Sequence, residues 1–203
     1  PAVNNHDLRV FDRISDAVGG TPMVRLHRSV ATTGCEVLAK LEYLNPMGSV
    51  KDRIARNMVQ RALDDGRLEP GGVLVESSSG NTAMGLAMMA ILNGLTCRLV
   101  VRRQTSTEKL DCLRAVGVEL VLVDGSLPPD DPDSYNRKAR EIARANPDFF
   151  FPYQHNNREN NEAHYLTTGP ELWEQMDGEV DYLVAGMGTG GTISGVARYL
   201  KER

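Results

Sequence analysis

Hydrophobic and polar positions along the chain follow two patterns in turn. Short β-branched runs predict buried strands, and longer stretches with apolar positions three and four residues apart predict helices. The predicted strands are residues 73–76, 97–101, 119–123, 149–151 and 182–185. The predicted helices are residues 49–64, 81–93, 106–116, 134–145, 161–176 and 189–201. This alternation indicates βαβ units, and therefore an α/β fold with a mostly parallel sheet.

Two features of the pattern indicate a division of the chain and an early end. The polar run at residues 154–162, rich in asparagine, is too long for a simple βα turn and predicts a functional crossover. The last predicted helix has no strand after it, although a doubly wound fold requires one there. We therefore expect the C-terminal part of the fold to lie beyond residue 203.

Composition narrows the class of protein. A hydrophobic content of 41% in 203 residues is enough for a sizeable core. The net charge of −4 argues against nucleic-acid and anionic-membrane partners. Neither a run of about 18 apolar residues nor a signal-peptide pattern occurs, which predicts a cytoplasmic protein without a membrane partner. The cysteines and histidines lack ligand spacing, so we expect free thiols and no metal.

A glycine-rich turn precedes the last predicted helix. Its residues are Gly186, Met187, Gly188, Thr189, Gly190, Gly191 and Thr192. Backbone amides and the helix dipole favour a phosphate at such a turn. The spacing also fits a dinucleotide fingerprint, but that needs an acidic residue about 20 residues further on, and too few residues follow. We expect a terminal phosphate monoester; the alternative is a turn that only packs helix on sheet.

A second polar turn lies between the strand at residues 73–76 and the helix at 81–93. It reads Glu-Ser-Ser-Ser-Gly-Asn-Thr at residues 76–82, and its hydroxyl and amide groups suit a carboxylate ligand. An N-cap for the following helix is an equal alternative. That helix is apolar on nearly all sides, so it is expected to be buried at the sheet edge where α/β sites form.

A lysine stands at the start of the first long helix. Ser49 is a natural N-cap, and at ~100° per residue Lys51 lies on the apolar stripe of the helix, with Arg53 on the polar side. Desolvation and the positive helix end both favour the neutral amine that Schiff-base chemistry requires. The alternative is a lysine whose amine reaches past the helix end to solvent.

A nucleophilic lysine, a phosphate turn and a carboxylate turn together indicate pyridoxal 5′-phosphate and an amino-acid substrate. The chain resembles the cysteine synthase and cystathionine β-synthase family of fold-type II enzymes, and is cysteine synthase-like. The matching motifs are GGTP at residues 19–22, NP at 45–46, SVKDR at 49–53, SGNT at 79–82, STEK at 106–109, Gln154, HY at 164–165, TGPE at 168–171 and GTGGT at 188–192.

The resemblance implies a role for several of these residues. Lys51 binds the cofactor covalently and later takes the α-proton, and Asn81 contacts the ring hydroxyl. The cofactor phosphate is held by Gly188, Thr189, Gly190, Gly191 and Thr192. The substrate carboxylate is held by Ser78, Ser79, Gly80, Thr82 and Gln154. The family usually has threonine in place of Ser78 and glycine in place of Ala83, changes that bear on the leaving group or nucleophile.

The resemblance also implies an architecture of two three-layer domains with mostly parallel sheets, like that of tryptophan synthase β. Residues 45–156 form a smaller, mobile domain that carries the substrate loop. Residues 1–44 and 157–203 belong to a larger domain that binds the cofactor phosphate and is truncated after residue 203. The family is generally homodimeric, and its C-terminal strands supply the residue that contacts the pyridine nitrogen.

The implied reaction is β-replacement on an O-activated L-serine, O-acetylserine or O-phosphoserine, by a sulfur nucleophile. Several related reactions stay open: a cystathionine β-synthase type, a diaminopropionate-type synthase that uses O-phosphoserine, and a serine or threonine dehydratase. A phosphate- or nucleotide-binding module without catalysis is the alternative from another class. Indifference to Lys51→Ala distinguishes that module from the enzymes.

Overall fold

The computed structural model describes residues 10–28, 34–128, 131 and 133–203. Its main sheet is parallel, with strand order β3 (Val73–Ser77), β4 (Thr96–Arg102) and β5 (Glu119–Val123). A parallel bridge from Leu74 to Phe150 adds one isolated contact beside β3. The three strands confirm the predicted βαβ pattern, while the predicted strand at 149–151 is reduced to that single bridge.

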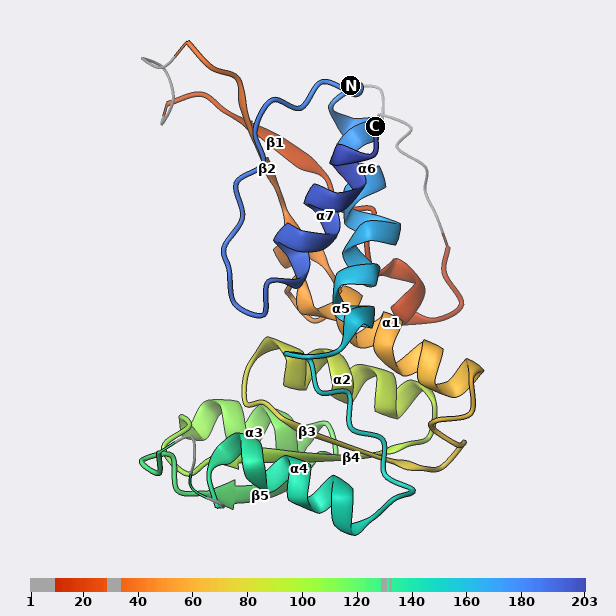
Figure 1. Cartoon of the computed structure of the whole chain (residues 1–203), viewed down its shortest axis with the longest axis vertical. Coiled ribbons are helices and arrows are strands. Elements are labelled where there is room, and N and C mark those ends of the chain that lie inside the picture. The colour runs from red at the N-terminus through yellow and green to blue at the C-terminus, as the bar shows by residue number, and fades with distance from the viewer. Residues whose placement is uncertain (1–9, 29–33, 129–130, 132) are drawn as a thin grey trace.

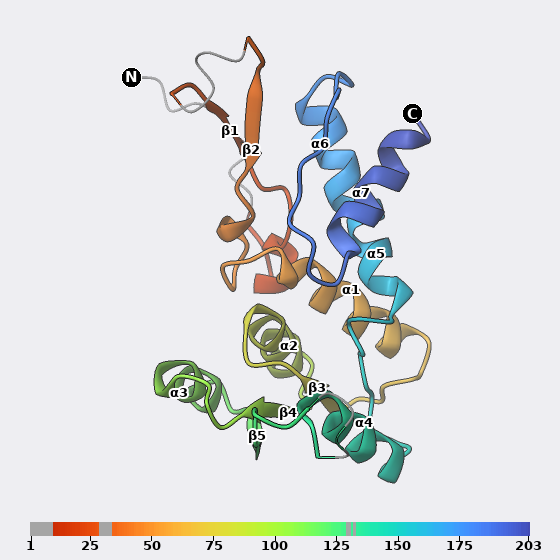
Figure 2. The same ribbon diagram turned by 60° about the vertical axis from the view of Figure 1, so that its left-hand side comes forward.

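Seven α-helices lie in the described residues: α1 (Lys51–Asp64), α2 (Asn81–Leu92), α3 (Thr107–Ala115), α4 (Tyr135–Ala145), α5 (Arg158–Ala163), α6 (Gly169–Gln175) and α7 (Gly191–Lys201). Helices α2 and α3 cover one face of the parallel sheet and α4 covers the other (Figures 1 and 2). Since α2 lies between the sheet and α1, it is buried almost all round, as its apolar sequence predicts.

The second group of elements lies on the other side of α1 (Figure 2). It contains α5, α6, α7 and an antiparallel hairpin of β1 (Met23–Leu26) and β2 (Val37–Lys40). The hydrophobic pattern did not predict this hairpin, whose two strands have no fully buried position. Helix α1 contacts both α2 and α5, so it joins the two groups.

The helix predicted at 161–176 is confirmed as one continuous helical run of α5, a π-helical turn, η3 (His164–Thr168), and α6, which begins at Gly169. One predicted strand is wrong. Residues 182–185 form no strand, and Tyr182 and Val184 are 91% and 93% exposed. A strand forms only beside a partner, and in the described part of the chain nothing pairs with this segment.

The core lies between the parallel sheet and the two helices α2 and α1. Its fully buried side chains include Leu74, Leu86, Leu99 and Val59. Within the described residues, no helix combines the length and the apolar character needed to cross a membrane.

Candidate functional site

Lys51 is the first residue of α1, the helix that contacts both groups of elements. The Ser49 hydroxyl accepts a hydrogen bond from the Lys51 backbone N–H at 3.1 Å, as a capping residue does. Burial lowers the pKa of the Lys51 amine, in the direction that the helical wheel predicts. A larger neutral fraction makes this amine a better nucleophile and base.

Helix α2 brings the second polar turn next to Lys51. The two helices touch at Gly85, where an added Cβ would lie 2.9 Å from Ala55 Cβ and 3.3 Å from the Lys51 carbonyl oxygen. Only glycine permits this distance. Gly85 is one helical turn from Asn81, so the exposed start of α2 lies close to the start of α1.

The second polar turn, residues 76–82, which we call the substrate turn, combines both alternatives that the sequence left open. The Ser78 hydroxyl oxygen accepts hydrogen bonds from the backbone N–H groups of Ala83, at 3.2 Å, and Gly80, at 3.4 Å, so it caps α2. The Thr82 hydroxyl instead donates to Gln154 Oε1 at 2.7 Å. The structure therefore brings together Thr82 and Gln154, which are 72 residues apart.

Glu76 fixes the base of the same turn, at the carboxyl end of β3. Its side chain is 1% exposed and accepts hydrogen bonds from the backbone N–H groups of Ser77, at 2.8 Å, and Gln154, at 3.1 Å. Burial raises the pKa of Glu76 to about 7, even though these hydrogen bonds lower it. The Glu76 carboxyl group therefore links the substrate turn, at Ser77, to the crossover segment of residues 154–162, at Gln154.

The glycine-rich turn leads into α7. Gly190 has φ of +82°, a left-handed conformation that favours glycine, and no heavy atom lies within 4 Å of a Cβ built on Gly186 or Gly188. The first N–H groups of α7 have no partner within the helix. The turn therefore offers open space in front of the first N–H groups of α7.

Asn160 links this glycine-rich turn to Gln154. Its side-chain amide, buried at 2% exposure, donates to the Gln154 carbonyl oxygen at 2.8 Å and to Thr189 Oγ1 at 2.9 Å. Thr189 Oγ1 also accepts from the Gly191 N–H at 3.3 Å. The predicted carboxylate-binding and phosphate-binding residues are thus connected through one amide.

An ion cluster fixes α1 to the second group of elements. The Arg53 guanidinium, 1% exposed, donates to Glu42 and Glu171, with nitrogen–oxygen distances of 2.7 Å to each. Lys40 pairs with Glu171 at 2.8 Å. Burial by itself would raise the pKa of Glu171, but the hydrogen bonds and charge of Arg53 outweigh it and lower the pKa to about 2.

This cluster lies on the polar side of α1. The helical wheel placed Arg53 on this side, and Arg53 is 3% exposed as a whole residue. Helix α5 packs against α1, and the acidic partner Glu171 is supplied from α6. A periodic pattern shows which positions are polar but does not show that a distant carboxylate covers them.

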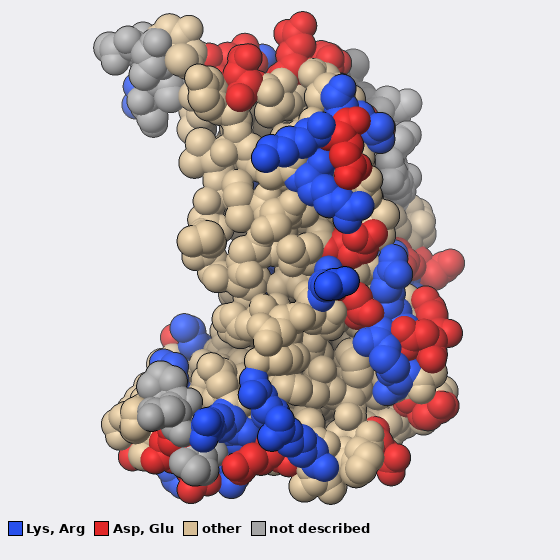
Figure 3. Space-filling view, viewed as in Figure 1, with Lys and Arg blue, Asp and Glu red and all other residues tan. Residues whose placement is uncertain are grey.

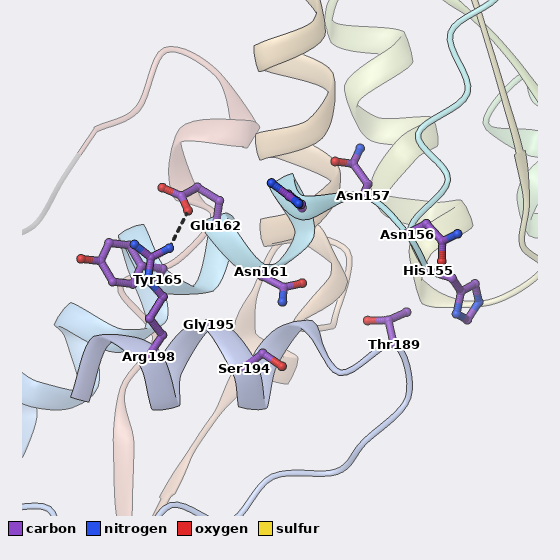
Figure 4. Close-up of a pocket in the computed structure, with 11 residues that line it drawn as sticks. His155, Asn156, Asn157, Asn161, Glu162, Tyr165, Thr189, Ser194, Gly195 and Arg198 are labelled. Carbon is purple, nitrogen blue, oxygen red and sulfur yellow. Dashed lines mark ion pairs between the residues drawn. The ribbon is translucent and has the colours of Figure 1, made fainter. Parts of the chain in front are cut away.

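A cavity of about 550 Å³ opens behind the glycine-rich turn, between α5 and α7. Thr189 and His155 lie at one end of it, and the ion pair of Glu162 with Arg198 lies at the other (Figure 4). Neither Lys51 nor the substrate turn lines this cavity. It is therefore separate from the cluster of predicted site residues, with which it shares only Thr189.

Charged side chains avoid the centre of the molecule on the side shown in Figure 3. Basic and acidic residues alternate along one edge and gather at the lower end, and uncharged residues cover the middle and the indentation between the two groups of elements. This face presents no continuous basic surface.

The sequence profile of a family described as "Pyridoxal-phosphate dependent enzyme" matches residues 14–203. The chain belongs to this family of pyridoxal-phosphate dependent enzymes. The cofactor predicted from Lys51 and the two polar turns is confirmed at the level of the family.

This pyridoxal-phosphate dependent enzyme is similar to curated proteins of two names. It is 41% identical over 201 residues to cystathionine beta-synthase of Apis mellifera, aligning 98% of this chain with 40% of that protein. It is 43% identical over 197 residues to cystathionine beta-synthase of Rattus norvegicus, with 96% and 35% aligned. Cysteine synthase 1 of Neurospora crassa is 42% identical over 189 residues, with 93% and 50% aligned. The chain spans half or less of these relatives.

A solved structure has the same fold. The hydrogen sulfide-producing enzyme from Fusobacterium nucleatum superposes with a TM-score of 0.87 at 35% identity, over 96% of this chain and 62% of that one. Together with the family match, this superposition confirms the α/β fold of type II and the resemblance to cysteine synthase and cystathionine β-synthase.

The residues of this pyridoxal-phosphate dependent enzyme fit the chemistry of the cofactor. An aldehyde requires an amine that is partly neutral, and burial lowers the pKa of Lys51. A phosphate requires donors without side chains in the way, and the open positions at Gly186 and Gly188 meet that need before α7.

Three residues that support the site were not predicted as site residues: Asn160, His164 and Glu76. All three are polar and almost fully buried, at 2%, 1% and 1% exposure. Asn160 lies in the asparagine-rich run, whose unusual length was the available signal. His164 was quoted only as part of a motif, and no local pattern shows that its ring faces α7.

Proposed function

We propose that this chain forms the cofactor- and substrate-binding part of an enzyme that carries out β-replacement on an O-activated L-serine with a sulfur nucleophile. The observation that carries the proposal is the convergence of Lys51, the substrate turn and the glycine-rich turn. Gly85 places the substrate turn next to Lys51, and Asn160 ties Gln154 to Thr189.

Lys51 has two roles in this proposal. Its amine would hold the aldehyde of the cofactor, and as a free base it would accept the proton from the substrate Cα. Both roles need the free-base amine, which the lowered pKa of Lys51 provides. Pyridoxal phosphate, when bound, supplies the electron sink for the negative charge that develops at that carbon.

The remaining residues bind and orient. Gly188, Thr189, Gly190, Gly191 and Thr192 hold the phosphate of the cofactor through backbone N–H and hydroxyl groups, and Asn81 contacts the ring hydroxyl. The carboxylate of the amino acid is held by Ser78, Ser79, Gly80, Thr82 and Gln154. The Ser78 oxygen accepts from backbone N–H groups, so its own O–H remains available to donate to a carboxylate oxygen.

The names of the relatives support this reaction class. Two are called cystathionine beta-synthase, one cysteine synthase 1, and the solved neighbour is a hydrogen sulfide-producing enzyme. Three alternative activities stay open for the same site: that of a cystathionine β-synthase, that of a diaminopropionate-type synthase using O-phosphoserine, and that of a dehydratase.

We also propose a cytoplasmic homodimer in which residues 45–156 form the smaller, mobile domain.

The test combines substrate pairs with a lysine variant. The protein is reconstituted with pyridoxal phosphate and incubated with O-acetylserine or O-phosphoserine, each with sulfide, thiosulfate, homocysteine or no nucleophile. Formation of a new sulfur amino acid supports the proposal, and formation only of a keto acid without nucleophile identifies a dehydratase. Lys51→Ala abolishes turnover, whereas Lys201→Ala, at an exposed lysine that ends α7, leaves it unchanged. Turnover unchanged in Lys51→Ala contradicts the proposal.

A further inference from the structure

Helix α7 begins in direct contact with the backbone of α5 and η3. A Cβ added to Gly191 would lie 1.9 Å from Asn160 Oδ1, and one added to Gly195 would lie 2.2 Å from the Asn161 carbonyl oxygen and 2.8 Å from His164 Cβ. These two glycines, one turn apart, allow the helix to approach this closely. The close approach places Thr192 beside the His164 ring.

The His164 ring connects two hydroxyl groups. Its Nδ1 lies 2.9 Å from Thr168 Oγ1, and its Nε2 lies 3.1 Å from Thr192 Oγ1. His164 is 1% exposed and Thr168 is 3% exposed, so both lie away from bulk water. Thr192 is half-buried and belongs to the glycine-rich turn. A continuous line of hydrogen bonds therefore runs from η3 to that turn.

The imidazole is neutral at physiological pH. Burial lowers the pKa of His164 to about 4, and the positive charges of Arg53 and Lys51 lower it further than the carboxylates of Glu42 and Glu171 raise it. A neutral imidazole has one N–H donor and one acceptor nitrogen. Each threonine hydroxyl beside it must take the complementary role.

Two tautomers satisfy these contacts, and they differ at Thr192. If Nδ1 carries the hydrogen, the Thr192 hydroxyl donates to Nε2 and presents only lone pairs to the glycine-rich turn. If Nε2 carries it, Nε2–H donates to Thr192 Oγ1 and the Thr192 proton is free. A phosphate accepts hydrogen bonds, so it favours the second arrangement.

We propose that His164 is a positioning residue: its Nε2–H donates to Thr192 Oγ1, so that the Thr192 hydroxyl proton points to the phosphate of the bound cofactor. Thr168 completes the arrangement by donating its hydroxyl proton to Nδ1. The inference rests on the proposed function, because that proposal places the phosphate at Gly188–Thr192.

The first experiment compares the dissociation constants of pyridoxal phosphate and pyridoxal, measured by absorbance titration. His164→Leu removes the donor, and we expect it to raise the dissociation constant of pyridoxal phosphate about tenfold and that of pyridoxal hardly at all. His164→Gln, whose amide can donate to Thr192, restores most of the difference. A merely structural role for His164 would weaken both ligands equally, which would overturn the inference.

Thr192 variants separate this inference from the proposed function. Thr192→Val removes the hydroxyl and Thr192→Ser keeps it. If Thr192→Val leaves the pyridoxal phosphate affinity unchanged, the proposed phosphate site is wrong. If Thr192→Val weakens binding but His164→Leu does not, only the role of His164 is wrong. In the double variant His164→Leu/Thr192→Val, we expect a loss no greater than that of Thr192→Val, because the histidine acts through that hydroxyl.

The second experiment needs no substitution. ¹⁵N NMR of the histidine-labelled protein with pyridoxal phosphate distinguishes the two ring nitrogens, with His164→Gln used to assign the signals. We expect Nε2 to be protonated and Nδ1 to be unprotonated at every pH between about 6 and 8, the range in which an ordinary histidine titrates. A protonated Nδ1 with unprotonated Nε2 in the loaded protein overturns the inference.

Discussion

Arg53 and Glu171 are 118 residues apart in the sequence and form a bidentate ion pair inside the protein, with both nitrogen–oxygen distances at 2.7 Å. Arg53 lies two residues after Lys51 on α1, and Glu171 lies on α6. The pair therefore fixes the start of α1, and with it Lys51, against the group of elements that carries the glycine-rich turn. The Gly20 N–H also donates to Glu171, at 2.9 Å.

Arg53→Met is expected to lower the free energy of unfolding by about 3–5 kcal/mol. The substitution leaves the partly buried carboxylates of Glu42 and Glu171, whose side chains are 18% and 20% exposed, without their main cationic partner, and that is the costly outcome for an ion pair away from solvent. Urea unfolding measures the loss. Arg56→Met is the matched control on the same helix: Arg56 pairs with Asp16 at 3.7 Å and its side chain is 42% exposed, so a change below about 1 kcal/mol is expected. Equal losses in the two variants would contradict this account of the cluster.

Gly85→Ala is expected to destabilise the protein although alanine favours helices. The added Cβ meets Ala55 Cβ at 2.9 Å and the Lys51 carbonyl oxygen at 3.3 Å, and such overpacking costs about 1–3 kcal/mol. Ala55→Gly removes the nearer contact and by itself costs about 1 kcal/mol. The double variant should lose less stability than the sum of the two single variants. Strict additivity would show that the two helices do not meet at this point.

Glu76→Gln is expected to change how stability depends on pH. The pKa of Glu76 is raised from 4.5 to about 7 in the folded protein. As pH rises from 4.5 to 7 the unfolded chain loses this proton and the folded protein keeps it, so the contribution of Glu76 falls by up to about 3 kcal/mol. Glutamine does not titrate. The free energy of unfolding of Glu76→Gln, relative to the unsubstituted protein, should therefore rise across this interval, and parallel curves would refute the assignment.

The thiol of Cys97 should react with iodoacetamide only after unfolding. Cys97 lies on β4, 4% exposed, and burial raises its pKa to about 12, so very little thiolate forms at neutral pH. Cys112 is exposed on α3 and should react in the native protein. Peptide mass mapping before and after denaturation distinguishes the two cysteines. Alkylation of both at the same rate in the native state would disagree with the structure.

The hydrophobic pattern predicts an element correctly where residues that are close in the sequence also pack against one another in the structure. Strands β3, β4 and β5 alternate with α2 and α3, and the stripe that contains Lys51 is correct because it depends on one helix alone. The burial of Arg53 was not predictable in this way, since its partner Glu171 lies outside any local window. Residues 182–185 have the composition of a strand, but composition does not supply the neighbouring strand.

The helix predicted at 161–176 forms, but it contains a π-helical turn between α5 and α6. This π-turn, at His164–Thr168, was not predictable from the pattern of apolar and polar residues, because that pattern does not show where one turn of a helix holds an additional residue. The reason for the turn lies in space: it places His164 against α7.

Asn160 has a single side-chain amide, and both of its hydrogens are used, one toward the Gln154 carbonyl oxygen and one toward Thr189. Neither contact can lengthen without turning the amide and straining the other. A displacement of Thr189 would therefore be transmitted through this one amide to the Gln154 backbone, 35 residues away along the chain.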